Sequence, residues 1–106
     1  MLFRSSDERK HALVKLAAKY ETPIIEDDVY GDLAFHVERP RTLKSFDAIG
    51  NVMWCGSFSK TLAPGFRVGW IHPGKFMAEV ERFKLLTSIA SATLPQLAVE
   101  IGRAHV

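Results

Sequence analysis

Apolar and polar residues alternate with a helical period at the start of the chain. Between residues 8 and 20, apolar side chains recur every three or four positions, and lysines and arginines fill the positions between them. The apolar stripe consists of Leu13, Leu16, Ala17 and Tyr20. Ser6 or Asp7 is a suitable N-cap, and Thr22-Pro23 stops the helix. The pattern predicts an amphipathic helix that packs this stripe on a core.

Short apolar runs without alternation follow, and they predict strands. Ile24-Ile25 and the run 51–55, which ends at Gly56-Ser57, are typical of strands buried on both faces. Residues 68–71 predict a third strand, closed by a turn that contains His72, to which we assign no catalytic role. Residues 32–37 are expected to be extended or irregular, and 39–46 to form a solvated connection leading into a short helix.

Two further helices are predicted near the carboxyl end, over 76–89 and 94–104. The apolar stripe of the first consists of Phe76, Met77, Val80, Phe83 and Leu86. Pro95 fits the first turn of the second. The order of elements is helix, strand, helix, strand, strand, helix, helix. It predicts an α/β layer with fewer strands than a complete sheet of typical size.

Composition narrows the classes of protein that fit. The chain has 106 residues, 47% hydrophobic and 25% charged, which suits one ordinary globular domain. Its net charge of +2 is too small to favour nucleic acid or a membrane as the main partner. A single cysteine, Cys55, excludes an internal disulfide and a cysteine-based zinc site, and it is expected in the core. Without a signal-peptide pattern or a long apolar run, cytoplasm is the default.

Candidate chemistry begins in the stretch after the second strand. Ser57, Ser59 and Arg67 supply the hydroxyl and guanidinium donors that bind phosphate well, and Lys60 lies among them. A lysine amine also forms an imine with an aldehyde. Together these residues suggest a phosphorylated aldehyde cofactor, for which pyridoxal 5′-phosphate is the obvious candidate. Taken alone, the same stretch also fits a polar loop with a solvated lysine.

A second polar stretch, residues 26–30, follows the first predicted strand. Asp27 at the strand end can hold a pyridine nitrogen in its protonated form, and Tyr30 can donate its phenol to the ring's 3′-oxygen. An N-cap or a surface loop is the alternative for Asp27 and Asp28, and it fits Asp28 and Glu26 equally well. A half-buried core position is the alternative for Tyr30. The two strand ends together make the cofactor interpretation stronger than either one does.

At these residues the sequence resembles the fold-type I pyridoxal-phosphate enzymes, the class I/II aminotransferases. The resemblance is carried by Glu26-Asp27-Asp28-Val29-Tyr30-Gly31 and by Ser57-Phe58-Ser59-Lys60-Thr61-Leu62-Ala63-Pro64-Gly65-Phe66-Arg67-Val68-Gly69. The two motifs are most similar to those of the aminotransferase-like domain of MocR-type GntR transcriptional regulators. By motif, Lys60 matches the Schiff-base lysine, Asp27 the pyridine-nitrogen partner and Tyr30 the 3′-oxygen partner. Ser57 and Arg67 match phosphate ligands, with Ser59 a weaker candidate.

The resemblance implies a fold and a place within a larger protein. It implies that residues 1–106 are an internal fragment of the pyridoxal-phosphate transferase large domain, with three strands of a mostly parallel sheet flanked by helices. The third strand matches the family's antiparallel one. The glycine-rich phosphate loop, the stacking aromatic residue, the Asn-Pro-x-Gly loop and the small domain with its carboxylate-binding arginine have no counterpart in the sequence.

Three functional hypotheses stay open at this point. The first is an aminotransferase that acts on an amino acid and a keto acid through a Lys60 Schiff base, as a homodimer in the full-length protein. The second is a cofactor-binding effector domain of a MocR/GntR-type regulator, with no nucleic-acid contact from this segment. The third is a non-catalytic α/β piece that packs against a partner chain. Under the first hypothesis, the fragment alone is expected to bind the cofactor weakly or not at all, because several of the family's ligands are missing from it.

Overall fold

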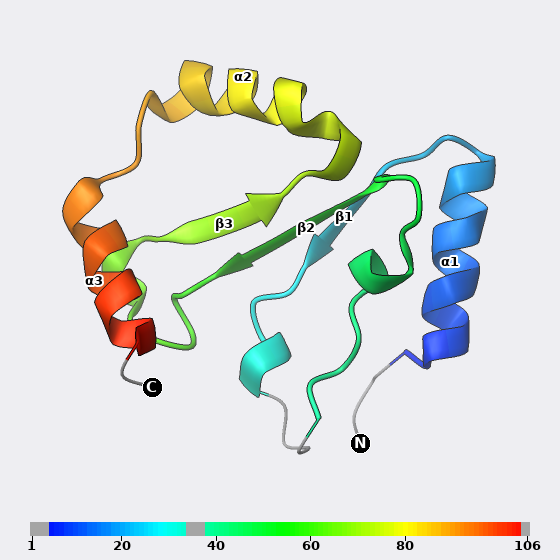
Figure 1. Ribbon diagram of the computed structural model, residues 1–106, viewed down its shortest axis with the longest axis horizontal. Coiled ribbons are helices and arrows are strands. Elements are labelled where there is room, and N and C mark those ends of the chain that lie inside the picture. The colour runs from blue at the N-terminus through cyan, green and yellow to red at the C-terminus, as the bar shows by residue number, and fades with distance from the viewer. Residues whose placement is uncertain (1–4, 34–37, 105–106) are drawn as a thin grey trace.

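The computed structural model describes residues 5–33 and 38–104, and its architecture is α/β (Figure 1). Its helices and strands are α1 (Asp7–Lys19), β1 (Ile24–Asp27), β2 (Val52–Ser57), β3 (Gly69–His72), α2 (Met77–Ser88) and α3 (Thr93–Ala104). Four short 3₁₀ turns join them: η1 (Gly31–Leu33), η2 (Leu43–Phe46), η3 (Pro64–Phe66) and η4 (Gly74–Phe76). The predicted helices and strands are confirmed to within a few residues, except that His72 ends β3 instead of lying in the turn.

The three strands form one sheet in the order β1-β2-β3. β1 and β2 run parallel, with Asp27 opposite Cys55, whereas β3 runs antiparallel to β2, with Gly69 opposite Ser57. Figure 1 shows the β1 and β2 arrows pointing the same way and β3 pointing back. The antiparallel third strand is the arrangement that the resemblance implied. Because β1 and β2 are parallel, the chain leaves both strands at the same edge of the sheet.

The sheet is covered on one face only among the described residues. η2 lies between α1 and β2, and the side chain of Val52 beneath it is fully buried. On the opposite face, Ile25 is 70% exposed. The expectation that β1 is buried on both faces is therefore wrong for this chain, because no described element packs against the second face.

Helix α1 packs through a narrower stripe than its sequence predicts. The buried residues are Val14 and Ala17, whereas Leu13, Leu16 and Tyr20 are about half or more exposed. The N-cap is Ser6, whose hydroxyl accepts a hydrogen bond from the Arg9 backbone N–H at 3.3 Å. The helix thus carries a second apolar stripe beside the one that faces the sheet layer.

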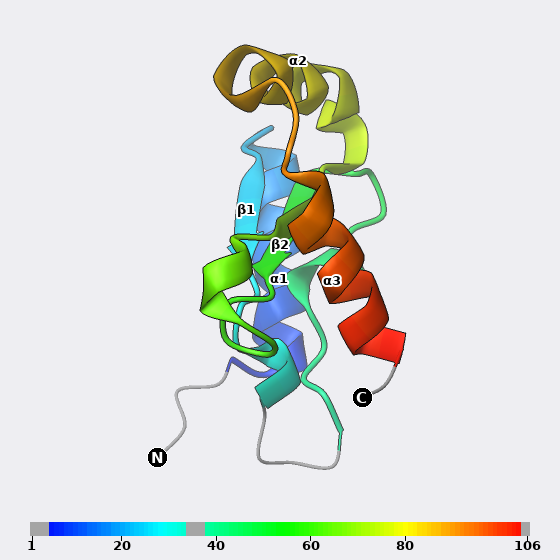
Figure 2. The same cartoon turned by 90° about the vertical axis from the view of Figure 1, so that its left-hand side faces the viewer.

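Helices α2 and α3 differ in how they are packed. None of the side chains of α2 is buried, and Phe83 and Leu86 from its predicted stripe are 69% and 71% exposed. Helix α3 buries Val99 and contacts η3. Seen from the side, α2 lies at one end of the sheet and α3 along its flank (Figure 2). No helix in the described part of the chain is long and apolar enough to cross a membrane.

The edge of the sheet where β1 and β2 begin is closed by buried polar groups. The Asp47 carboxylate, whose side chain is fully buried, accepts hydrogen bonds from the backbone N–H groups of Asn51 and Val52, both at 2.9 Å. It also forms an ion pair with Lys44 at 2.9 Å. The Asn51 side chain donates to the Thr22 carbonyl at 2.7 Å. These contacts fix the entry of both strands.

Candidate functional site

The first half of the candidate site lies where β1 ends. Asp27 is the last residue of β1, and the backbone N–H of Asp28 donates to the Cys55 carbonyl at 2.9 Å, which extends the parallel pairing. The side chain of Asp27 is exposed, and no hydrogen bond or ion pair within residues 5–33 and 38–104 engages its carboxylate. Tyr30 follows in the turn before η1 and is 66% exposed, so its interpretation as a half-buried aromatic is wrong.

The second half lies where β2 ends. The Ser57 hydroxyl donates to the Ser59 hydroxyl at 2.8 Å and accepts from the Ser59 backbone N–H at 3.1 Å. Arg67 Nη1 donates to the Ser59 hydroxyl at 3.5 Å. The three predicted phosphate ligands are therefore linked by hydrogen bonds across one loop. They gather the kind of donors that an oxyanion needs.

Lys60 is at the exposed apex of a closed turn. The Phe58 carbonyl accepts hydrogen bonds from the backbone N–H groups of Leu62 and Ala63, at 3.0 and 3.1 Å. The Phe58 N–H donates to the Val68 carbonyl at 3.0 Å, which ties the start of the turn to the strand that returns. These hydrogen bonds fix the backbone on both sides of Lys60, and the Lys60 side chain is exposed. A lysine amine held in this way is accessible to a ligand.

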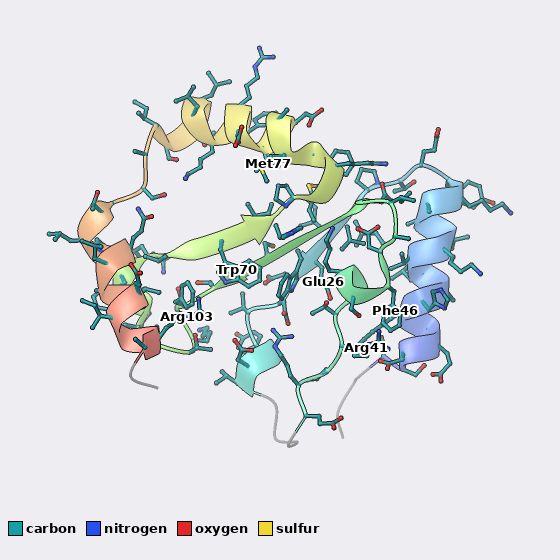
Figure 3. All side chains as sticks on the ribbon, in the orientation of Figure 1. Glu26, Arg41, Phe46, Trp70, Met77 and Arg103 are labelled. Atoms are coloured by element: carbon teal, nitrogen blue, oxygen red, sulfur yellow. The ribbon has the colours of Figure 1, made fainter. Side chains whose placement is uncertain are left out.

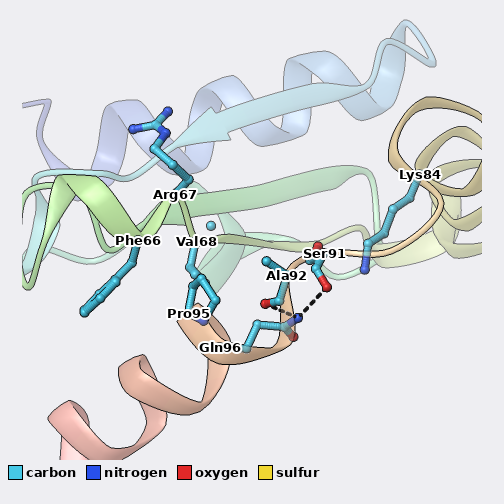
Figure 4. A pocket seen from close by; sticks show the side chains of 9 residues that line it. Phe66, Arg67, Val68, Lys84, Ser91, Ala92, Pro95 and Gln96 are labelled. Carbon is cyan, nitrogen blue, oxygen red and sulfur yellow. Dashed lines mark hydrogen bonds between the residues drawn. The ribbon is translucent and has the colours of Figure 1, made fainter.

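The return of the chain into β3 depends on Arg67. Its backbone is left-handed, with φ 53° and ψ 46°, an uncommon conformation for a residue other than glycine. Its guanidinium also donates to the Pro64 carbonyl at 3.3 Å. Arg67 borders a hollow of about 110 Å³ that Lys84, Pro95 and Gln96 also line. Figure 4 shows its guanidinium extending away from Pro95 and Gln96.

Cys55 lies between the two halves, and its environment keeps it protonated. Burial raises the pKa of its thiol, and the negative charges of Asp27, Glu26 and Asp28 raise it further. A thiol with a raised pKa is a poor nucleophile at neutral pH. This agrees with the interpretation of Cys55 as a packing residue. The influence of Asp27 on Cys55 also fits their positions as register partners on one face of the sheet.

The acids next to Asp27 have roles that their sequence positions do not reveal. Glu26 accepts hydrogen bonds from the N–H groups of Leu43 and Lys44 at 2.7 and 3.0 Å, so it caps η2 from a strand that is distant in sequence. Asp28 is not a surface-loop residue, because its side chain is only 13% exposed. It accepts from Trp54 Nε1 at 2.8 Å and pairs with Arg39. Arg39, expected in a solvated connection, is therefore engaged in an ion pair.

Comparison with known proteins identifies relatives over most of the chain. Residues 6–99 match the family model described as aminotransferase class I and II. The chain is 44% identical over 96 residues to an uncharacterized HTH-type transcriptional regulator, YjiR, of Escherichia coli, covering 91% of this chain and 20% of that protein. It is 37% identical over 93 residues to aromatic-amino-acid aminotransferase 1 of Thermococcus litoralis, covering 87% of this chain and 22% of that one.

Solved structures give the same result for the fold. Kynurenine aminotransferase of Pyrococcus horikoshii, solved in complex with PMP, superimposes with a TM-score of 0.78 at 34% identity. It matches 86% of this chain and 23% of its own. A multiple substrate aminotransferase from Thermococcus profundus gives 0.79 at 36% identity, with 86% and 23% covered. The chain thus spans about a fifth to a quarter of the length of its relatives. On the family match and these similarities together, it belongs to the class I and II aminotransferases.

Proposed function

We propose that residues 1–106 are a segment of the large domain of a pyridoxal-phosphate-dependent aminotransferase, and that Lys60 is the residue to which the cofactor's aldehyde carbon bonds. The observation that carries this proposal is the parallel pairing of β1 with β2. It brings the Asp27 end of one strand and the Lys60 turn of the next to a single edge of the sheet. In open α/β sheets this is the edge where ligands bind.

The phosphate end of the cofactor fits the donors that follow β2. Ser57, Ser59 and Arg67 are already linked to one another by hydrogen bonds, and an oxyanion placed among them replaces weak hydroxyl contacts with charge-assisted ones. The Arg67 guanidinium supplies a fixed positive charge. These three residues would hold the phosphate, with Ser59 contributing its backbone N–H as well as its hydroxyl.

The ring end of the cofactor fits the residues at the end of β1. The Asp27 carboxylate has no partner within the described residues, so it is available to pair with a protonated pyridine nitrogen. The exposed Tyr30 phenol is available for the 3′-oxygen. When bound, pyridoxal phosphate withdraws electrons from the α-carbon of an amino acid. Once the amine of an amino acid has displaced it from the cofactor, the Lys60 amine would be free to move the α-proton.

The proposed substrates are an amino acid and a keto acid. Two of the solved neighbours are a kynurenine aminotransferase and an archaeal alanine:glyoxylate aminotransferase, at 34% identity each. We expect the complete protein to work as a homodimer. Sedimentation of the complete protein at micromolar concentration measures its mass, and a stable monomer that retains transamination contradicts this expectation.

A second candidate function is the effector domain of a transcriptional regulator. It is favoured by the HTH-type regulators among the relatives, including YjiR at 44% identity. The same residues would bind the cofactor, but binding would control DNA association instead of supporting turnover. The coding sequence upstream of residue 1 separates the two: a winged-helix region followed by a linker favours the regulator.

The proposal is tested on the complete protein that contains this chain. We expect pyridoxal phosphate to produce a visible absorption band that Lys60→Ala removes and Lys75→Ala, the matched control at another exposed lysine, leaves intact. Borohydride reduction followed by peptide mass mapping is expected to locate the cofactor on Lys60. A band that persists in Lys60→Ala, or an adduct on another lysine, contradicts the assignment. Absence of any band favours a non-catalytic piece that packs against a partner.

A further inference from the structure

A cluster of charged and aromatic side chains lies directly behind the proposed ring-binding end. The Asp28 carboxylate accepts a hydrogen bond from Trp54 Nε1 at 2.8 Å and pairs with the Arg39 guanidinium. Arg39 also donates from Nε to Asp32 at 2.6 Å. We call Asp28, Arg39 and Trp54 the Asp28 clamp. Its members come from three separate parts of the chain: the end of β1, the connection before η2, and β2.

The clamp is held by its surroundings as well as by its own contacts. The Arg39 guanidinium lies 5.9 Å from the centre of the Trp54 ring, and Trp54 meets Trp70 of β3 edge-on at 4.5 Å. Figure 3 shows Trp70 extending from β3 toward the centre of the molecule, between β3 and η1. Burial alone lowers the pKa of Arg39, but its hydrogen bonds and ion pairs with Asp28 and Asp32 raise the pKa above the ordinary value.

Two glycines leave space for the clamp and for the tryptophan that supports it. A Cβ atom added at Gly31 would overlap an Asp28 carboxylate oxygen and would lie 2.5 Å from Arg39 Nη2. A Cβ atom added at Gly56 would lie 2.6 Å from the Trp70 ring. All three contacts are closer than real Cβ atoms allow. The clamp therefore occupies space beside Gly31 that a side chain there would enter, and Gly56 leaves room for Trp70, which packs against Trp54.

Strand geometry links the clamp to Asp27. Successive side chains of an extended strand point to opposite faces, so fixing Asp28 on the Trp54 face directs Asp27 to the face of Cys55 and Ser57. The Arg39–Asp32 ion pair holds the far side of the same turn, beyond Tyr30. Both proposed ring ligands, Asp27 and Tyr30, are thus placed between anchored residues. Neither is anchored by a side-chain contact of its own within the described residues.

We propose that the Asp28 clamp is a positioning device, which sets Asp27 and Tyr30 for the cofactor ring without touching it. The clamp's action on the backbone of residues 27–30 follows from its contacts alone. Its effect on the cofactor rests on the proposed function. The positioning residues are Arg39 and Trp54, because they hold Asp28 from outside the strand.

The first experiment measures the clamp without any cofactor. In the complete apo protein, amide hydrogen exchange is followed over residues 26–33 in Trp54→Phe, which keeps a ring but loses the N–H, and in Arg39→Gln. We expect exchange in this segment to accelerate about tenfold in both variants. Arg41→Gln is the matched control. It removes the same charge at a position two residues along the chain, where the arginine side chain stacks on Phe46 and not on the clamp. It should leave this segment unchanged.

The second experiment measures the cofactor. We expect the dissociation constant of pyridoxal phosphate to rise about tenfold in Arg39→Gln and Trp54→Phe. The pH dependence of the visible band should shift in the same variants, because Asp27 is less well placed against the ring nitrogen. Arg39→Lys, which keeps the charge, should recover part of the loss. A merely structural role would lower the melting temperature but would leave the pH dependence of the band as in the parent.

The outcomes separate the two proposals. Unchanged exchange over residues 26–33 in both variants overturns the clamp, whatever the cofactor result. Accelerated exchange with an unchanged dissociation constant and pH profile shows that the turn is held but does not position the ring ligands, and it also overturns the inference. A band that does not depend on Lys60 overturns the proposed function. In that case the hydrogen-exchange result alone tests whether the clamp holds residues 26–33.

Discussion

The two edges of the parallel pair β1–β2 are built in opposite ways. Where the strands begin, the fully buried Asp47 carboxylate is engaged by Lys44 and by two backbone N–H groups, and Asn51 is 2% exposed. Where the strands end, Asp27 and Lys60 are exposed, and the hydroxyl donors of the loop after β2 contact mainly one another.

The difference separates residues that stabilise the fold from residues that are available to a ligand. A buried charge is tolerated only when it is paired and hydrogen-bonded, as Asp47 is, so the closed edge contributes to stability. One buried atom there, Asn51 Oδ1, has no hydrogen-bond partner among the described residues. An exposed acid and an exposed amine at adjacent strand ends contribute little to stability. At the open edge, the exposed residues Asp27 and Lys60 are therefore the ones that can be substituted without loss of the fold, and this is the edge where binding is expected.

The largest effect is expected at the closed edge. Asp47→Ala leaves two backbone donors without their acceptor and leaves the Lys44 ammonium with the Val52 carbonyl alone, so we expect the free energy of unfolding of the complete protein to fall by about 3 kcal/mol. Denaturant titration measures it. A change below about 1 kcal/mol would show that water takes over these contacts, and the contrast between the edges would then be lost.

A smaller effect is expected from acid at the same edge. Burial alone raises the pKa of Asp47, but hydrogen bonds from Val52, Lys44 and Asn51 lower it below its ordinary value. The folded-state pKa is thus depressed, so this stabilisation is complete above the unfolded value of about 4 and is lost as the pH falls through the folded value. Thermal melts between pH 6 and 3 are expected to show a melting temperature that falls with the pH, and Asp47→Asn should make this fall smaller. If the melting temperature of Asp47→Asn falls as steeply, other carboxylates cause the acid sensitivity.

The smallest effect on stability is expected at the open edge. Asp27→Asn should change the free energy of unfolding by no more than about 0.5 kcal/mol, because its exposed carboxylate has no partner within the described residues. The same substitution should weaken pyridoxal phosphate binding about tenfold, since it removes the charge that we propose pairs with the ring nitrogen. Denaturant and cofactor titrations on the same samples provide the comparison. A large loss of stability with unchanged binding would reverse the roles of the two edges.

Local patterns were enough to predict most elements but not their packing partners. The helical period of residues 8–20 predicts α1, yet the side chains that are buried are Val14 and Ala17, not Leu13 and Leu16. The helix has two apolar stripes, and spacing alone does not say which of them meets the η2 layer. Similarly, α2 forms where its period predicts it, but with no buried side chain among the described residues. The helical period of apolar residues shows which face of a helix is apolar, but it does not show which element covers that face.

The candidate site shows the same division. Residue type and spacing suggested Asp27, Tyr30, Ser57, Ser59, Lys60 and Arg67, and their roles toward a cofactor stay predictions. The structure adds that the phosphate candidates are linked through Ser59 and that Tyr30 is exposed. The sequence interpretation missed Asp28, because its partners Arg39 and Trp54 are 11 and 26 residues away. Contacts between residues this far apart in the sequence produce no local pattern from which they could be predicted.

The sequence by itself determined the helices, the strands and the family, because period, capping residues and the two motifs are local properties of the chain. Only the tertiary structure decided which acid is free and which is held. Asp27 and Asp28 are neighbours with the same side chain, but alternation along β1 places them on opposite faces. On one face Trp54 and Arg39 donate to Asp28, and on the other no donor within the described residues bonds to the Asp27 carboxylate.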